Sequence, residues 1–241
     1  MYYINENVVT FYKESFVEGF VYHGSPNGDI KVFEPRESTQ KGAYVYATDK
    51  IEIAGVFGFK MSSIEKSLSF CGDNTLIVTE RVQGYFKSHD HPVYIYKLDG
   101  RSFDYFDENS WGKHEVRSPE KVVPLEIIKF DSALEMLKQF EQEGKIKLFL
   151  YPNRPNFLPS NDFDLFAAVA KIYAFNPERN SNVFDRLKRY HPDFAGFCDV
   201  IKAKMDKMDD KEKLQYAAGL YDFKTQKCSQ EVYDFFKEKT L

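Results

Sequence analysis

One stretch of this sequence places residues capable of chemistry close together. His23 ends a short aromatic run and is followed at once by Gly24 and Ser25, and the next loop contains Arg36. Histidine exchanges a proton near neutral pH, and arginine binds anions. A lone histidine more often belongs to a hydrophobic core, so the residues that accompany His23 decide its interpretation.

A second aromatic strand, AYVYAT, covers residues 43–48. Side chains two residues apart in a strand point to the same face, so Tyr44 and Tyr46 are expected to lie one behind the other on one surface. A helix carrying Phe57 follows this strand.

Several common functional motifs are absent. The sequence has no GxxxxGK[ST] phosphate loop, no GxGxxG after a strand, no GxSxG and no HExxH. His89 and His91 in SHDHP lack the further ligands of a metal site, and a solvated turn is the better interpretation. Cys71, Cys198 and Cys228 show no ligand spacing and indicate reduced thiols in a cytosolic protein. We expect no metal.

Composition limits the partners. The chain has 241 residues with 33 Lys and Arg against 37 Asp and Glu, a net charge of −4, so no global positive field attracts nucleic acid or an anionic membrane. No apolar run approaches the roughly 18 residues that a spanning helix needs, and the first residues show no secretory leader. We expect a soluble protein without a membrane partner, for which nucleic acid is a weaker candidate than protein.

The chain has two regions with different sequence patterns. Up to about residue 130, short aromatic and β-branched runs separated by turn residues predict strands; the clearest are GFVYHGS, AYVYAT, NTLIVTERVQGYF, PVYIYKLDG and VVPLEIIKF. One helix interrupts them after Thr48 and Asp49, which are both acceptable N-caps. The sequence thus predicts a mainly β region first.

The later region is predicted to be mostly helical. Apolar residues recur at helical spacing, and helices are expected over residues 131–144, 161–175, 181–190, 193–208 and 228–239. LFLYPNRPNFLPS is expected to be an extended connector and KMDKMDDKEK an exposed charged face. The expected fold is α+β, with one domain at 1–131 and a helical C-terminal region at 132–241 packed on it.

The segments YHGS, FEPR, KGAYVYAT followed by IEIAGVFG, and HEVRSPEKVVPLEII together resemble the ADP-ribosyltransferase superfamily. More narrowly, they resemble its His-Tyr-Glu branch, which includes diphtheria-type toxins and poly(ADP-ribose) polymerases. The resemblance covers residues 19–130 and leaves the helical region without a match. It implies a split β-sheet core, NAD as the substrate and no metal.

Individual residues of the family's site can be matched to positions in this sequence. His23 matches the family histidine, and Gly24 matches the next position, whose backbone holds the nicotinamide carboxamide. Tyr44 keeps a Gly-x-Tyr arrangement and Tyr46 keeps an aromatic-Ala pair; Tyr44 is slightly favoured as the catalytic clamp. The implied NAD-binding residues are His23, Gly24, Ser25, Arg36, Tyr44, Tyr46 and Phe57.

The late strand of the family delivers a glutamate. Glu115 in HEVRSPEKV lies where this strand should begin, with Glu120 as the alternative. Arginine-specific members carry a second Glu or Gln two residues before the acid, and Lys113 stands there in this chain. This departure argues against the arginine-specific branch. The implied catalytic residues are Glu115, His23 and Tyr44.

The resemblance implies an NAD-dependent ADP-ribosyltransferase that modifies a protein, in the manner of a bacterial effector, toxin or phage-encoded modifier. It would act in the cytoplasm of the producing cell or of a host cell. Two alternatives keep the fold: an RNA 2′-phosphotransferase-like enzyme, and a non-catalytic module that binds a nucleotide or a protein. An unrelated α+β domain is the remaining alternative.

Overall fold

The computed structural model describes residues 17–37, 42–59, 64–105 and 114–237. The chain forms two compact units, the first drawn from Met1–Lys60 and His91–Met136 and the second from Met61–Asp90 and Leu137–Leu241. Helices and antiparallel sheets are both present, which confirms the α+β class. The sequence-based division at residues 131 and 132 falls near the later boundary, but it did not anticipate that Met61–Asp90 groups with the C-terminal region.

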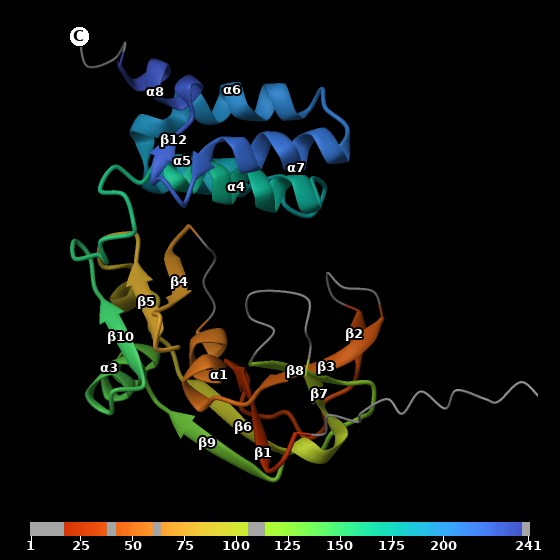
Figure 1. Ribbon diagram of the computed structural model, residues 1–241. Coiled ribbons are helices and arrows are strands. Elements are labelled where there is room, and N and C mark those ends of the chain that lie inside the picture. The colour runs from red at the N-terminus through yellow and green to blue at the C-terminus, as the bar shows by residue number, and fades with distance from the viewer. Residues whose placement is uncertain (1–16, 38–41, 60–63, 106–113, 238–241) are drawn as a thin grey trace, which may run out of the picture. The chain divides into compact units, whose positions relative to one another are not determined.

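The first unit is built on an antiparallel sheet of seven strands in the order β7-β8-β3-β1-β6-β9, with β2 paired to β3 (Figure 1). Its elements are β1 (Phe20–Ser25), β2 (Arg36–Glu37), β3 (Ala43–Thr48), α1 (Ile51–Gly58), β6 (Val93–Asp99), the 3-10 helix η1 (Gly100–Ser102), β7 (Asp104–Tyr105), β8 (Glu115–Ser118) and β9 (Glu126–Phe130).

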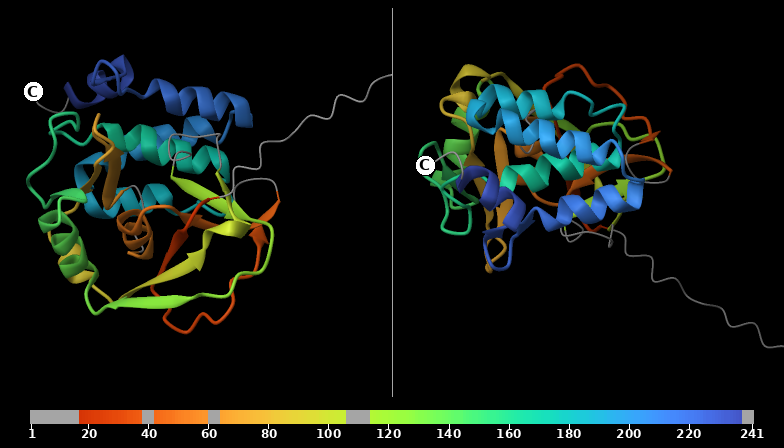
Figure 2. Two further views of the ribbon diagram at one scale, coloured as in Figure 1. Left: turned by 60° about the horizontal axis from the view of Figure 1, so that its bottom comes forward. Right: turned by 90° about the horizontal axis from the view of Figure 1, so that it is seen from above.

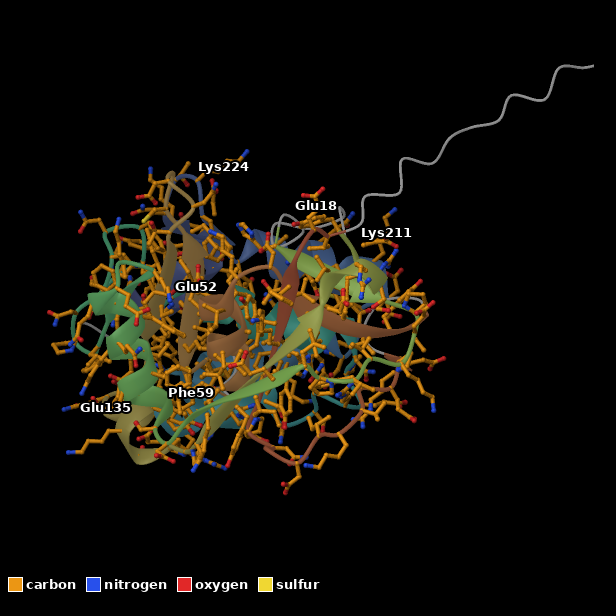
Figure 3. The ribbon with its side chains drawn as sticks, turned by 90° about the horizontal axis from the view of Figure 1, so that it is seen from below. Glu18, Glu52, Phe59, Glu135, Lys211 and Lys224 are labelled. Carbon is orange, nitrogen blue, oxygen red and sulfur yellow. The ribbon has the colours of Figure 1, made fainter. Side chains whose placement is uncertain are left out.

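The alternation of side chains along these strands builds the core of the first unit. Val21, Val45 and Val116 are buried on three neighbouring strands, together with Tyr96 and Leu98 of β6. Because successive side chains of a strand point to opposite faces, the residues between them face the other way, where α1 packs on β1, β3 and β6. Figure 3 labels Glu52 in the first turn of α1 and Phe59, its C-cap.

The second unit combines a small sheet with a group of helices. The sheet has the order β10-β5-β4, and β10 runs parallel to β5. Helices α4 to α7 pack side by side, as the views of Figure 2 show. The elements are β4 (Lys66–Phe70), β5 (Leu76–Glu80), α2 (Tyr85–Ser88), β10 (Ile146–Phe149), α4 (Asp164–Phe175), α5 (Val183–Tyr190), η2 (Pro192–Phe194), α6 (Ala195–Met205), α7 (Asp210–Gly219), β11 (Tyr221–Asp222), β12 (Lys227–Cys228) and α8 (Gln230–Lys237). Helix α3 (Ala133–Gln142) spans the boundary between the two units.

Most of the expected elements are present, and the differences have local causes. The run NTLIVTERVQGYF is a strand only to Glu80, because Gly84 adopts a positive φ of 66° and opens the short helix α2. The charged run near residue 210 is not only an exposed face: Asp209 and Glu212 form a capping box that starts α7. The expected extended connector begins with β10.

Neither expected N-cap of α1 caps it with its side chain. The N-cap is Lys50, and it makes no side-chain capping hydrogen bond. Thr48 Oγ1 accepts a hydrogen bond from Lys50 N at 3.3 Å, and the Asp49 carboxylate contacts His114 instead.

Among the helices within the described ranges, none is long and apolar enough to cross a lipid bilayer.

Candidate functional site

A pocket of about 290 Å³ opens in the first unit where β1, β3, α1 and the start of β8 meet. This volume lies at the small end of the range typical of small-molecule sites. The lining combines aromatic rings, two histidines and one carboxylate: Tyr22, His23, Gly24, Tyr46, Ala47, Thr48, Ile53, Ala54, Phe57, His114 and Glu115.

The pocket exists because β1 and β3 pair at a single point. Tyr22 lies opposite Thr48, and no further pair of the two strands is present among their described residues. One residue further along β1, a side-chain hydrogen bond connects the two strands where their backbones do not pair. Nδ1 of His23 donates to the carbonyl oxygen of Tyr46 at 2.7 Å. The two strands are thus joined by a side chain at the point where the pocket begins.

This hydrogen bond fixes the tautomer of His23. A carbonyl oxygen only accepts, so Nδ1 carries the hydrogen and Nε2 of the neutral ring is an acceptor. Burial lowers the pKa of His23 below 6.5; the bond to Tyr46 opposes this shift, and the positive charge of Arg36 adds to it. The ring also contacts Phe33, with centroids 4.6 Å apart. At neutral pH the pocket therefore contains an uncharged imidazole.

Strand register brings Glu115 to the same pocket. Thr48 is opposite Tyr22 on one side and opposite Glu115 on the other, so the three residues form one row across β1, β3 and β8. Residues paired in this way point to the same face of a sheet. Glu115 is half-buried and lines the pocket, whereas Glu120 is exposed and lies outside its lining.

The three aromatic candidates, Tyr44, Tyr46 and Phe57, lie in different environments. Tyr46 and Phe57 line the pocket, and Phe57 is 54% exposed. Tyr44 is not part of the lining; its ring lies under the guanidinium of Arg117 at 4.4 Å and meets Tyr46 edge-on at 6.2 Å. The geometry therefore favours Tyr46 over the sequence-based preference for Tyr44.

Gly24 and Ser25 have structural reasons for their positions. A Cβ on Gly24 would lie 1.7 Å from the carbonyl oxygen of Ala54, so only glycine lets α1 approach β1 this closely. Ser25 is buried outside the lining and accepts a hydrogen bond from Asn27 N at 3.1 Å. Gly24 lines the pocket, and Ser25 holds the turn that follows β1.

Positive charge lies around the pocket and not in it. Arg36 is exposed on β2, opposite Tyr44, and it is near enough for its charge to lower the pKa of His23. The described lining contains neither lysine nor arginine. No cluster of His, Cys, Asp or Glu that could hold a metal ion is present in the parts of the chain that the structure describes.

Sequence reasoning did not assign Tyr22, His114 or Asp49 to this site. Tyr22 and His114 line the pocket, and Asp49 accepts a hydrogen bond from Nδ1 of His114 at 2.9 Å. Only the position of His114 next to Glu115 could have indicated it. Lys113, the position at which the sequence departs from arginine-specific ADP-ribosyltransferases, lies outside the described residues.

No protein-family model, no curated protein and no solved structure matches this chain. The interpretation of the pocket therefore depends on its geometry and on the chemistry of its residues.

Proposed function

We propose that this protein is an NAD-dependent ADP-ribosyltransferase and that the pocket of the first unit holds the nicotinamide ribose half of NAD. One observation carries the proposal. His23, Tyr46, Phe57 and Glu115 belong to four separate segments and line one pocket, whereas Ser25, Arg36 and Tyr44 of the implied set lie outside its lining.

The sheet supports the same proposal at the level of fold. β1 and β3 separate after the pair formed by Tyr22 and Thr48, and the pocket lies at this separation. We propose that the first unit has the split sheet of ADP-ribosyltransferases. The helices of the second unit have no counterpart in this proposal.

Transfer of ADP-ribose breaks the bond between C1′ of the ribose and the ring nitrogen of nicotinamide. The electron pair of that bond goes to the nitrogen, which becomes neutral, and C1′ gains oxocarbenium character as in glycoside hydrolysis. The Glu115 carboxylate would accept a hydrogen bond from the ribose 2′-hydroxyl and stabilise the positive charge. A preorganised group of this kind is commonly worth about 3 to 4 kcal/mol.

The other residues would orient the substrate. Nε2 of neutral His23 would accept a hydrogen bond from a ribose hydroxyl, and the rings of Tyr46 and Phe57 would hold the flat nicotinamide. Arg36, outside the lining, would meet the pyrophosphate. No metal takes part in this scheme.

The proposed acceptor is a protein, and the proposed setting is the cytoplasm of the producing cell or of a host cell invaded by an effector or toxin. An RNA 2′-phosphotransferase-like activity needs cationic side chains around its phosphate, and the described lining offers none. A module that binds nucleotide without turnover uses the same pocket, so turnover itself must be measured.

The test is incubation of the full chain with labelled NAD, with and without cell lysate, while nicotinamide release and label transfer are followed. Wild-type protein is expected to release nicotinamide and transfer label, and Glu115→Gln is expected to lose both by at least about 100-fold. Glu120→Gln is the matched control and should behave as wild type.

Other results would change the proposal. Equal activity of Glu115→Gln and wild type would remove this carboxylate from the mechanism. Saturable NAD binding without turnover would indicate a binding module, and neither binding nor turnover would overturn the proposal.

A further inference from the structure

Beside Glu115, a histidine and an aspartate form a pair that the scheme above does not use. His114 lines the pocket, and its Nδ1 lies 2.9 Å from Oδ1 of Asp49. The backbones are joined as well, because Asp49 N donates to the carbonyl oxygen of His114 at 3.2 Å. The second carboxylate oxygen of Asp49 accepts a hydrogen bond from the Tyr105 hydroxyl at 3.4 Å. The aspartate is therefore held on both oxygens and through its backbone.

This arrangement orients the imidazole. A carboxylate only accepts hydrogen bonds, so Nδ1 of the neutral ring carries the hydrogen and Nε2 carries the lone pair. Both side chains are largely shielded, with 14% of the His114 side chain and 25% of the Asp49 side chain exposed. An aspartate that holds a histidine in one tautomer is the arrangement of a general base.

We propose that His114, positioned by Asp49, is the base that takes the proton from the attacking group of the acceptor. This inference rests on the proposed ADP-ribosyltransferase function and specifies the chemistry of its acceptor: a nucleophile that must lose a proton as it attacks, such as a hydroxyl group. A carboxylate acceptor would need no such base, because it attacks without losing a proton. His114 is thus a catalytic residue, and Asp49 is a positioning residue.

The step balances as follows. The bond between C1′ and the nicotinamide nitrogen breaks, and its electrons stay on the nitrogen. The hydroxyl oxygen of the acceptor forms a new bond to C1′, and its proton moves to Nε2 of His114. The resulting imidazolium is stabilised by Asp49 and later gives the proton to solvent.

Two small nucleophiles separate this role from that of Glu115. Methanol loses a proton when it attacks C1′, whereas azide is an anion and loses none. Removal of a general base typically slows its step by about 100- to 10,000-fold, and a nucleophile that needs no base should escape that loss. Loss of the carboxylate that stabilises C1′ should slow both reactions.

The experiment follows the products formed from labelled NAD by the full chain in buffered methanol and in sodium azide. We expect His114→Gln to lose methyl ADP-ribose formation by at least about 100-fold and to keep ADP-ribosyl azide formation within a few-fold of wild type. Asp49→Asn should show the same pattern, and Glu115→Gln should lose both products. His89→Gln, a change at an exposed histidine of the second unit, is the control and should lose neither.

The outcomes distinguish the two proposals. Active wild type with equal loss of both products in His114→Gln would overturn the base and leave His114 a binding residue. Unchanged methanol and azide products in that variant would remove it from the reaction. Wild-type protein that forms no product from NAD would overturn the proposed function together with this inference.

Discussion

At the scale of single residues, His23 has two functions in the pocket. Its Nδ1 joins β1 to β3 where their ladder stops, and its half-buried ring forms part of the pocket wall. Acceptance of a hydrogen bond at Nε2 requires the neutral ring, which burial favours, whereas Nδ1 would still donate to Tyr46 if the ring were protonated. The binding of a ligand hydroxyl at Nε2 and the stability of the folded state should therefore depend on the same proton.

This dependence predicts a pH effect on stability. Burial lowers the pKa of His23 in the folded state below 6.5, the value of the unfolded chain. Between the two pKa values the unfolded state binds more protons than the folded state, so stability rises with pH and is lost as pH falls through this window. The slope from this one group is at most about 1.4 kcal/mol per pH unit.

The measurement is the thermal midpoint of wild type and of His23→Asn at several pH values from about 7.5 to about 5.5. Wild type is expected to lose more stability than the variant toward acid pH. The pKa of His191 is also lowered, but that residue is present in both proteins and cancels in the difference. Parallel curves for the two proteins would contradict the assignment of the effect to His23.

The two tyrosines of β3 give a second prediction at this scale. Only Tyr46 lines the pocket, and Tyr44 packs beside it against Arg117. A stacked aromatic ring contributes about 0.5 to 1.5 kcal/mol, so Tyr46→Ala should weaken NAD binding about 2- to 10-fold. Tyr44→Ala is the matched control and should bind nearly as wild type; isothermal titration of both variants decides between them. A greater loss in Tyr44→Ala would restore the sequence-based preference.

At the scale of elements, the contact between β1 and α1 holds the pocket in shape. Gly24 faces the backbone of α1, and Gly58 faces Val93, where an added Cβ would lie 2.6 Å from Cγ1. Both contacts need glycine because the neighbouring atoms leave no space for a methyl group. Since Phe57 and Ala54 line the pocket from α1, any displacement of this helix would change the site.

Gly24→Ala is therefore expected to destabilise the protein strongly. The new Cβ would lie 1.7 Å from the carbonyl oxygen of Ala54, a backbone atom that moves only if the helix moves. Overpacking typically costs about 1 to 3 kcal/mol, and a backbone clash should reach the upper end of this range or exceed it. Gly72→Ala, where no atom lies within 4 Å of the added Cβ, is the control. Urea unfolding gives both values, and equal midpoints would contradict the described contact.

Elements with a strong local pattern could be predicted from the sequence, and elements defined by distant pairing could not. β1, β3 and α1 follow from alternation and helical spacing within a few residues. β10 could not be distinguished from an extended connector, because it becomes a strand only by pairing with β5, where Ile146 lies opposite Leu76. The capping box of α7 is a local signal, because Asp209 and Glu212 stand three residues apart in the sequence.

The same distinction applies to the site. Glu115 was predicted because its segment resembles a known motif. The pair of His114 and Asp49 depends on the register of β3 against β8, which no local pattern reveals. Tyr46 and Tyr44 could not be distinguished from the sequence because both share one face of a strand, whereas in the structure Tyr44 lies under Arg117 and Tyr46 lines the pocket.

At the scale of the whole molecule, the two units are stabilised differently. The second unit has a buried ionic cluster in which the guanidinium of Arg81 binds Asp162 and Asp164, each at 2.7 Å. Arg154 also pairs with Asp162, at 2.8 Å, and Arg81 donates to Ser67 Oγ at 2.7 Å. The cluster joins β4 and β5 to the start of α4. No residue of this cluster lines the pocket of the first unit.

We expect Arg81→Leu to destabilise the protein while the pocket retains its chemistry. Removal of one partner leaves buried carboxylates without compensation, which typically costs about 3 to 5 kcal/mol. In this variant Asp162 still pairs with Arg154, so most of the lost stability comes from the buried carboxylate of Asp164. The double variant Arg81→Leu with Asp164→Leu should therefore be more stable than Arg81→Leu alone. Arg101→Leu removes an exposed pair with Asp99 and should destabilise the protein far less than Arg81→Leu. Urea unfolding followed by circular dichroism measures the stabilities, and NAD titration at low temperature, where Arg81→Leu is still folded, measures the pocket. Loss of NAD binding by folded Arg81→Leu would show that the pocket depends on the second unit.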